Sequence, residues 1–470
     1  MLMATSQDSY RGLLSLAWPV ILSRASQGVI GFSDAAMVAP LGGDAIAATT
    51  TGASNALNFF ILPMGVVFIV QSFVSQLAGK GDVEGSRRYA WYGLLVSAIA
   101  ALLAAGFTLV LPNLTAGLGF TENVRTLLID YMTIRLFSCG AVIGIEAIGN
   151  WFGGLGNTVL PMIVSFIAMA SNLALNWVFI YGNLGAPALG VKGAALASSL
   201  SSLIAFAVIF VAFLRARIDR SKLPPPPVEA VALPSETPRT RPQELLRMLR
   251  FGLPSGANWF LEFAAFTVFI NVIVARLGTT SVAAMMAVVQ VNSIAFMPSF
   301  GVSTAGAILV GQAIGAGEKG RVKMIVRRTM TLAACWQVFV GITYALMPST
   351  VMSVFGATDT AEGVELVQLG ATLLLVSTAW QLFDAIAISL SEALRAAGDT
   401  AWCMWARILL AWVLCLPLAG GLVVYGGVGP VGAIACFVVY LAGLAALMTY
   451  RYRSGAWKNI DLTGTAAPAH

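Results

Sequence analysis

The sequence contains a series of apolar runs, each long enough to cross a lipid bilayer as a helix. A hydrocarbon core of about 30 Å requires about 20 residues in helical conformation. Only helices and closed barrels satisfy their backbone hydrogen bonds in lipid, and uninterrupted runs of this length exclude barrel strands. The sequence therefore predicts an all-α integral membrane protein with twelve transmembrane helices. The runs lie at 13–38, 53–77, 90–111, 131–152, 159–180, 191–214, 251–275, 282–313, 329–347, 367–390, 401–422 and 428–448.

Composition agrees with this prediction and argues against an enzyme. Of the 470 residues, 58% are hydrophobic and 10% are charged, whereas soluble proteins carry roughly 25% charged residues. The five cysteines stand singly and the one histidine is His470, so neither a disulfide framework nor a Cys/His zinc site is expected. The chain lacks a phosphate-binding GxxxxGK[ST] motif. We expect no cofactor other than a coupling ion.

The distribution of basic residues predicts the orientation of the chain in the membrane. If the N-terminus is cytoplasmic, 21 Lys and Arg residues lie inside, three lie outside and three fall within the runs. Cytoplasmic loops carry such an excess of positive charge. Both termini are therefore expected in the cytoplasm, with the protein in the cell inner (plasma) membrane. The net charge of +6 has this explanation, and no nucleic-acid partner is expected.

The two halves of the chain repeat each other. Leu41-Gly42 recurs as Leu277-Gly278, and Gly65 recurs as Gly301, all at an offset of 236 residues. We expect two six-helix lobes related by pseudo-twofold symmetry about the membrane normal, with a substrate site between them. The predicted division is an N-lobe at 1–214, a Pro/Arg-rich cytoplasmic linker at 215–250, a C-lobe at 251–450 and a cytoplasmic tail at 451–470.

Four carboxylates fall within the apolar runs, namely Asp34, Glu146, Glu262 and Asp384. A carboxylate in lipid is costly and indicates a functional site. Asn258 precedes Glu262 by four residues, so the two share a helix face. Each acid could exchange a proton or bind a sodium ion with its oxygens. The alternative is that the carboxylates only form hydrogen bonds with neighbouring helices.

Other polar residues within the runs leave alternatives open. Arg24 needs a partner, but Asp34 is roughly 15 Å away along the helix, so the sequence identifies none. Arg24 could form a structural ion pair or present a cation to a cavity. Asn172 and Asn176 lie four residues apart, and such amides often only join helices. Pro19 permits a kink in the first helix.

The sequence resembles the multidrug and toxic compound extrusion (MATE) family, and within it the NorM-type branch, over nearly the whole chain. The order of the matching segments within two six-helix halves carries the resemblance. These segments are Gly31-Phe32-Ser33-Asp34, 172–176 leading to 180–182, 193–197, Asn258-Trp259 with Glu262, Gln381-Leu382-Phe383-Asp384 and 394–400.

The resemblance implies a secondary active exporter that antiports organic, cationic substrates against Na⁺ or H⁺ by rocker-switch alternating access. It implies roles for particular residues, which are expectations here. The cation or proton coupling residues would be Asp34, Asn172, Asn176, Ser198, Glu262 and Asp384, with Glu262 and Asp384 as the Na⁺ ligands. The substrate-binding residues would be Asp384, Glu262, Gln381, Trp380 and Trp259, and Pro19 would be a hinge.

The competing interpretation is a lipid-linked sugar flippase or polysaccharide exporter of related fold. Such proteins often line the cavity with several arginines and exceed twelve spans, whereas here Arg24 is the arginine clearly placed in the middle of a run. The expected partners are small organic substrates and membrane lipid, and we expect the chain to act as a monomer.

Overall fold

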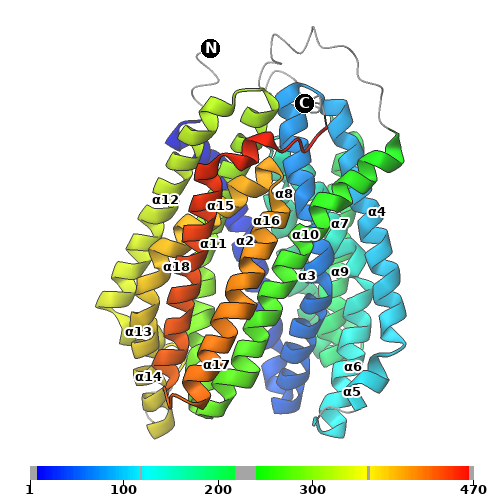
Figure 1. The fold of residues 1–470 in the computed structure, drawn as a ribbon. Helices are drawn as coiled ribbons and strands as arrows, with labels where there is room; N and C mark the ends of the chain where they lie inside the picture. The colour runs from blue at the N-terminus through cyan, green and yellow to red at the C-terminus, as the bar shows by residue number, and fades with distance from the viewer. Residues whose placement is uncertain (1–7, 117–118, 218–239, 357–359, 465–470) are drawn as a thin grey trace. The chain divides into compact units, whose positions relative to one another are not determined.

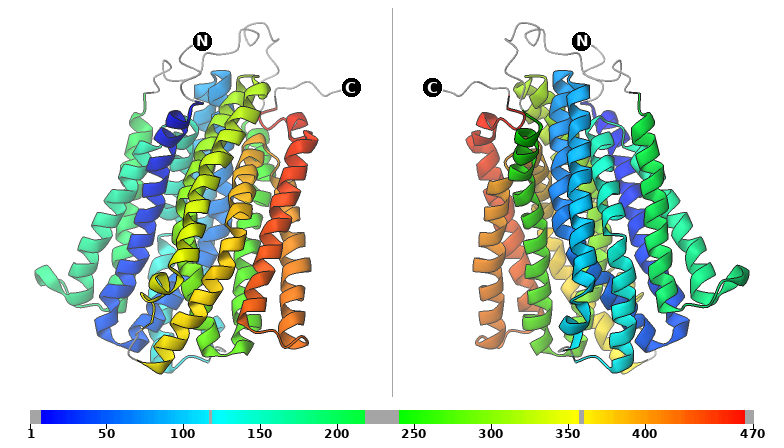
Figure 2. Two further views of the ribbon diagram at one scale, coloured as in Figure 1. Left: turned by 90° about the vertical axis from the view of Figure 1, so that its left-hand side faces the viewer. Right: turned by 90° about the vertical axis from the view of Figure 1, so that its right-hand side faces the viewer.

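The computed structural model describes residues 8–116, 119–217, 240–356 and 360–464, and these form helices joined by short connections (Figure 1). Among these described residues, eleven helices are long and apolar enough to cross a membrane, or twelve if one bent pair counts as a single span. The predicted all-α membrane architecture with up to twelve spans is therefore confirmed. Within the second half, for example, the helices at 279–315, 319–346 and 381–397 pack against one another and run side by side in Figure 2.

The described residues of the first half form eight α-helices and two short 3₁₀ segments. They are α2 (Tyr10–Val38), η1 (Ala39–Leu41), α3 (Gly43–Lys80), α4 (Val83–Thr108), α5 (Leu111–Ala116), α6 (Glu122–Phe137), α7 (Cys139–Gly154), α8 (Val159–Tyr181), η2 (Asn183–Gly185) and α9 (Val191–Arg215).

In its described residues, the second half contains α-helices, short 3₁₀ segments and two π-helical insertions, η5 and η8. Its elements are α10 (Arg241–Val268), η5 (Phe269–Ile273), η6 (Val274–Leu277), α11 (Thr279–Gly315), α12 (Lys319–Leu346), α13 (Pro348–Met352), α14 (Ala361–Ser377), η7 (Thr378–Trp380), α15 (Gln381–Ala397), α16 (Thr400–Ile408), η8 (Leu409–Cys415), α17 (Leu416–Val424), α18 (Pro430–Ser454) and η9 (Ala456–Asn459).

Two predicted boundaries differ from the structure. The run at 131–152 was predicted as one span, but α6 and α7 meet at Ser138 with a bend of 42°. Ser138 ends α6 by donating its hydroxyl to the carbonyl of Arg135 at 2.7 Å. The predicted linker at 215–250 lies largely outside the described residues, and α10 begins within it at Arg241. Pro242 is compatible with this start because the first turn of a helix needs no backbone N–H from it.

The chain forms two compact units whose boundaries fall inside helices. One unit contains Met1–Ile21 and Ala257–His470, and the other contains Leu22–Gly256. Helix α2 is thus divided after Ile21, and α10 is divided after Gly256. Each division lies two residues beyond a proline inside the helix, Pro19 in α2 and Pro254 in α10. A proline removes one backbone hydrogen bond and permits a kink.

The start of each divided helix is held by a buried acidic residue. Glu244 of α10 accepts hydrogen bonds from Arg88 at 2.9 and 3.0 Å and from Tyr92 at 2.8 Å. Asp8, just before α2, pairs with Arg321 at 2.7 Å. Asp8 and Glu244 stand 236 residues apart, the offset that relates the two halves in the sequence. The repeat is therefore visible as similar ion pairs at equivalent helix starts.

Gly65 and Gly256 allow α3 and α10 to approach within backbone contact. A Cβ atom built on Gly65 would lie 2.6 Å from the Cα of Gly256, and one built on Gly256 would lie 2.5 Å from the carbonyl oxygen of Leu62. Real Cβ atoms do not come so close to backbone, so the helices would have to separate. Glycine at such positions is typical of close helix packing in membranes.

We expect Gly65→Ala to destabilise the protein by about 1–3 kcal/mol, because overpacking a tight contact forces backbone shifts. Thermal unfolding of the purified protein in detergent measures the change as a lower transition temperature. Gly106→Ala is the matched control, since its Cβ would meet nothing within 4 Å. An unchanged transition in Gly65→Ala would contradict the close packing of α3 on α10.

Candidate coupling and substrate site

Asp34 lies in a buried cluster of uncharged hydrogen-bond donors. Its Oδ1 accepts hydrogen bonds from the Nδ2 atoms of Asn172 at 3.1 Å and Asn176 at 2.6 Å. Its Oδ2 accepts one from the hydroxyl of Ser198 at 2.6 Å. Asp34 is 8% exposed and both asparagines are 0% exposed. The structure therefore brings together the four residues predicted for the first half of the chain.

Helices α8 and α9 position these donors. Asn172 and Asn176 stand one turn apart on α8, and Ser198 lies on α9. The two helices come close because a Cβ on Gly193 would lie 2.3 Å from the carbonyl oxygen of Phe179. Asn172 also donates to Ser198 at 3.0 Å, which connects the cluster across the two helices. The carboxylate is thus held in one place by three neutral donors.

The Oδ1 atom of Asn176 is buried and has no hydrogen-bond partner. An unpaired buried acceptor is costly, and this one belongs to a side chain that contacts Asp34. If Asp34 becomes protonated, it needs an acceptor for its new O–H group. Rotation of the Asn176 amide by half a turn would supply that acceptor. The cluster can therefore accommodate both charge states of Asp34.

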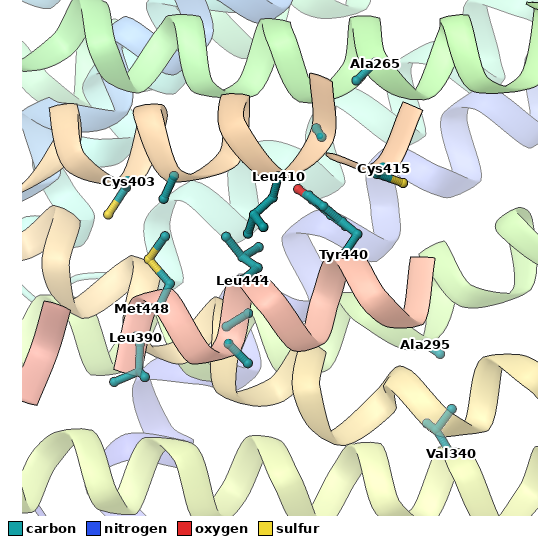
Figure 3. Close-up of a cluster of buried hydrophobic side chains, with 14 of the residues drawn as sticks. Ala265, Ala295, Val340, Leu390, Cys403, Leu410, Cys415, Tyr440, Leu444 and Met448 are labelled. Atoms are coloured by element: carbon teal, nitrogen blue, oxygen red, sulfur yellow. The ribbon is translucent and has the colours of Figure 1, made fainter. Parts of the chain in front are cut away.

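Glu262 forms an ion pair with Arg407. Arg407 of α16 donates to one oxygen of Glu262, and the hydroxyl of Tyr440 on α18 donates to the other at 3.1 Å. Figure 3 shows Tyr440 extending from α18 toward the helical segment that carries Leu410 and Cys415. Tyr440 and Leu410 belong to the buried hydrophobic core of this unit. The apolar packing therefore fixes the tyrosine that orients Glu262.

Asp384 of α15 has an uncharged partner. The Nε2 atom of Gln337 on α12 donates to its Oδ2 at 3.2 Å. The charges of Glu262 and Arg407 both act on Asp384, so these three charged groups form one cluster. Gln337 also has a buried Oε1 atom without a hydrogen-bond partner. Asp384 therefore resembles Asp34 in being bound by an amide that keeps an unused acceptor.

The remaining predicted contacts are distributed around this cluster. Gln381 donates to Asn292 of α11 at 2.9 Å, not to Asp384, although the two share a helix face. The ring of Trp380 is centred 6.3 Å from that of Phe437, and the ring of Trp259 is centred 5.9 Å from that of Phe300. Their predicted roles in binding substrate remain predictions.

Arg24 and Glu146 pair with each other, which answers the question left open by the sequence. The two guanidinium nitrogens of Arg24 lie 3.2 and 3.3 Å from the two carboxylate oxygens of Glu146. Arg24 also lies over the ring of Phe68 at 5.4 Å. Their side chains are 22% and 12% exposed. The pairing joins α2 to α7 and neutralises both charges.

Sequence reasoning did not find several partners in these clusters. The sequence does mark Arg407 as unusual, because it is a charged residue within an apolar run, but it does not identify the partner of Arg407. Gln337, Asn292 and Tyr440 carried no such signal, because single polar residues are frequent in transmembrane helices. Their partners are 47 to 178 residues away in the chain, so no helical spacing connects them.

Up to twelve membrane-length helices in the described residues of a duplicated chain, with carboxylates inside the helices, are typical of an integral membrane transporter. The family model MatE matches residues 19–178 and 254–419, which is more than half of the chain. The protein belongs to the MATE family. As a transporter of this family it is not an enzyme. The comparisons do not separate the branches of the family, so the NorM-type assignment remains a prediction.

Solved structures of MATE transporters share this fold. A MOP superfamily transporter from Pyrococcus furiosus, described as having a binding pocket of reverse polarity, is 19% identical with a TM-score of 0.82, covering 96% of this chain and 97% of that one. A MATE protein in complex with MaL6 is 20% identical with a TM-score of 0.83 and the same coverages. The eukaryotic MATE transporter AtDTX14 is 18% identical with a TM-score of 0.79, covering 97% of each chain.

Proposed function

We propose that the protein exports small organic cations in exchange for H⁺ or Na⁺ by rocker-switch alternating access. It would act as a monomer in the cell inner (plasma) membrane, with both termini in the cytoplasm. The coupling residues would be Asp34 with Asn172, Asn176 and Ser198, together with Asp384 and Glu262. Asp384, Glu262, Gln381, Trp380 and Trp259 would contact the substrate, and Pro19 would act as a hinge.

The environment of Asp34 is the observation that carries this proposal. A carboxylate on a membrane helix is costly to leave charged, and Asp34 has three neutral donors and no basic partner within the described part of the chain. It must therefore gain and lose a neutralising cation as its surroundings change. An exporter uses such a site by binding cation and substrate in different conformations.

The orientation of the amides favours a proton at Asp34. Sodium is bound by several converging oxygens, whereas both asparagines present their nitrogens to the carboxylate. A sodium ion would require both amides to turn, while a proton requires only the one unpaired acceptor on Asn176. We therefore assign H⁺ as the coupling ion at Asp34.

The lipid-linked sugar alternative requires cations that are free to bind phosphate or sugar acids. Each of the three arginines within the predicted spans already has a partner. Glu146 and Glu262 balance the charges of Arg24 and Arg407, whereas Arg135 donates to the neutral hydroxyl of Ser138 at 2.6 Å and, among the described residues, is the one of the three without a paired carboxylate. As the structure describes them, the predicted spans therefore lack the several free arginines that would bind phosphate or sugar acids. This favours the cation exporter.

Purified protein in liposomes tests the proposal directly. A fluorescent organic cation is loaded, and either a pH gradient or a sodium gradient is imposed while potassium and valinomycin hold the membrane potential at zero. We expect the pH gradient to drive dye transport above the level of protein-free liposomes. Transport driven by sodium alone would overturn the assignment of H⁺ as the coupling ion, but it would still support the proposed export of organic cations. Failure under both gradients with several cationic dyes would reject the proposed function.

A further inference from the structure

The four carboxylates within the predicted spans divide into two kinds. Glu146 has both oxygens bound by Arg24, at 3.2 and 3.3 Å. Glu262 has one oxygen bound by Arg407 and the other by the hydroxyl of Tyr440 at 3.1 Å. Each compact unit contains one of these arginine-paired acids. In both pairs the positive charge of an arginine guanidinium balances the negative charge of the carboxylate.

The other two carboxylates have only uncharged hydrogen-bond donors. Asp34 is bound by two amides and a hydroxyl, and Asp384 is bound by the amide of Gln337. Neither lies within ion-pair distance of a basic side chain in the part of the chain that the structure describes. Each compact unit again contains one of them. Both units therefore hold the same combination of one paired and one unpaired acid.

This difference matters because arginine does not lose its proton in proteins. An acid paired with arginine has its charge balanced within the protein, so it has no need for an external cation while the pair is intact. An unpaired acid can enter a dry environment only when a proton or metal cation neutralises it. Only the unpaired acids should therefore exchange cations during transport.

We infer that Arg24 and Arg407 are built-in counter-ions that remove Glu146 and Glu262 from coupling, so that each unit exchanges one cation, at Asp34 and at Asp384. This inference rests on the proposed function and narrows it: Glu262 is no longer counted among the coupling residues and keeps only its proposed contact with the substrate. It fixes the coupling number at two cations for each substrate. It also makes Arg407 a positioning residue that acts through Glu262.

The same charges indicate the substrate class. When Asp384 has released its cation, its cluster contains two carboxylates and one guanidinium. The net charge of this cluster is then equivalent to one negative charge, which a monovalent organic cation matches. A divalent organic cation would leave an unbalanced positive charge in a largely buried site, at a high cost. We therefore expect monovalent cations to be transported in preference to divalent ones.

The coupling number can be measured at equilibrium in liposomes whose membrane potential is clamped at zero. The logarithm of the final dye ratio is plotted against the logarithm of the imposed proton or sodium ratio. The slope equals the number of cations exchanged for each dye molecule and does not depend on the rate of transport. We expect a slope of two for the unmodified protein with a monovalent dye.

Two variants separate the inference from general damage. Arg407→Met leaves Glu262 without its counter-ion and should raise the slope to three. Arg407→Met combined with Glu262→Gln removes both charges and should restore a slope of two, which also covers the case in which the single variant folds poorly. Arg125→Met is the control, because Arg125 forms an exposed pair with Glu122, and its slope should stay at two.

The outcomes distinguish this inference from the proposed function. No dye gradient under either ion would reject the exporter itself and the inference with it. A slope other than two in the unmodified protein, or an unchanged slope in Arg407→Met, would overturn the inference while leaving export intact. Divalent dyes competing as well as monovalent dyes would overturn the substrate class. In Arg407→Met the same cluster would carry two net negative charges. Divalent dyes should therefore compete better with the monovalent dye in this variant than in the unmodified protein.

Discussion

Replacing Asp34 with asparagine is expected to abolish gradient-driven export. The amide cannot take up or release a proton, so the first half of the chain would stay in its neutralised state and the transport cycle would stop. The fold should survive, because asparagine has nearly the same shape and its one oxygen, at the Oδ1 position, can still accept the hydrogen bonds from Asn172 and Asn176. Dye transport in liposomes should fall to the level measured without protein.

The matched control is Asp44→Asn on α3. Asp44 is an exposed acid that accepts a hydrogen bond from Asn123 at 2.6 Å, so it needs no cation for charge balance. This variant should transport dye as well as the unmodified protein does. Size-exclusion chromatography in detergent should show that both variants are folded. Full gradient-driven export by Asp34→Asn would contradict the coupling role of this carboxylate.

Replacing Arg24 with methionine should destabilise the protein by about 3–5 kcal/mol, which is the usual cost of leaving one member of a buried ion pair alone. Glu146 would lose the two hydrogen bonds of 3.2 and 3.3 Å that now balance its charge. Methionine keeps most of the apolar stem of arginine, so lost packing should contribute little. Equilibrium unfolding in mixed micelles measures the change in the free energy of unfolding.

A second substitution tests whether the loss comes from the unbalanced charge. Arg24→Met combined with Glu146→Leu removes both charges and should recover most of the lost stability, because apolar pairs often replace buried ion pairs without cost. Breaking the exposed Arg125–Glu122 pair by Arg125→Met should cost less than about 1 kcal/mol. Equal losses in Arg24→Met and in the double variant would mean that packing, not charge, explains the effect.

The membrane-spanning helices could be predicted from the sequence because a span in lipid must be mostly apolar and must satisfy its own backbone hydrogen bonds. Each apolar run contains the central part of one helix or, at 131–152, 367–390 and 401–422, parts of two consecutive α-helices. The break at Ser138 could not be predicted, because it depends on one local hydrogen bond within an otherwise apolar run. The start of α10 at Arg241 also differs from the prediction, because the prolines up to Pro242 indicate an extended linker rather than the first turn of a helix.

The polar clusters were predicted where helical spacing reveals them. Asn172 and Asn176 share a face because they are one turn apart, and the resemblance to the MATE family connected them with Asp34. The ion pair between Arg24 and Glu146 was not predicted, since it joins helices 122 residues apart and pairing across helices depends on packing. Gln381 shows the limit of the spacing argument, because it points to Asn292 rather than to its neighbour in sequence.

The division of α2 and α10 between the two compact units has a consequence for how the protein is made. The unit containing Leu22–Gly256 lacks its final segment until the ribosome has passed the linker and entered the second half. The other unit needs the first part of α2, which is synthesised first but packs with residues made last. Proteins usually complete their N-terminal domain first during synthesis. Here neither six-helix half can finish folding alone, so a nascent chain must keep its earliest helix incompletely packed until almost all of the protein is in the membrane.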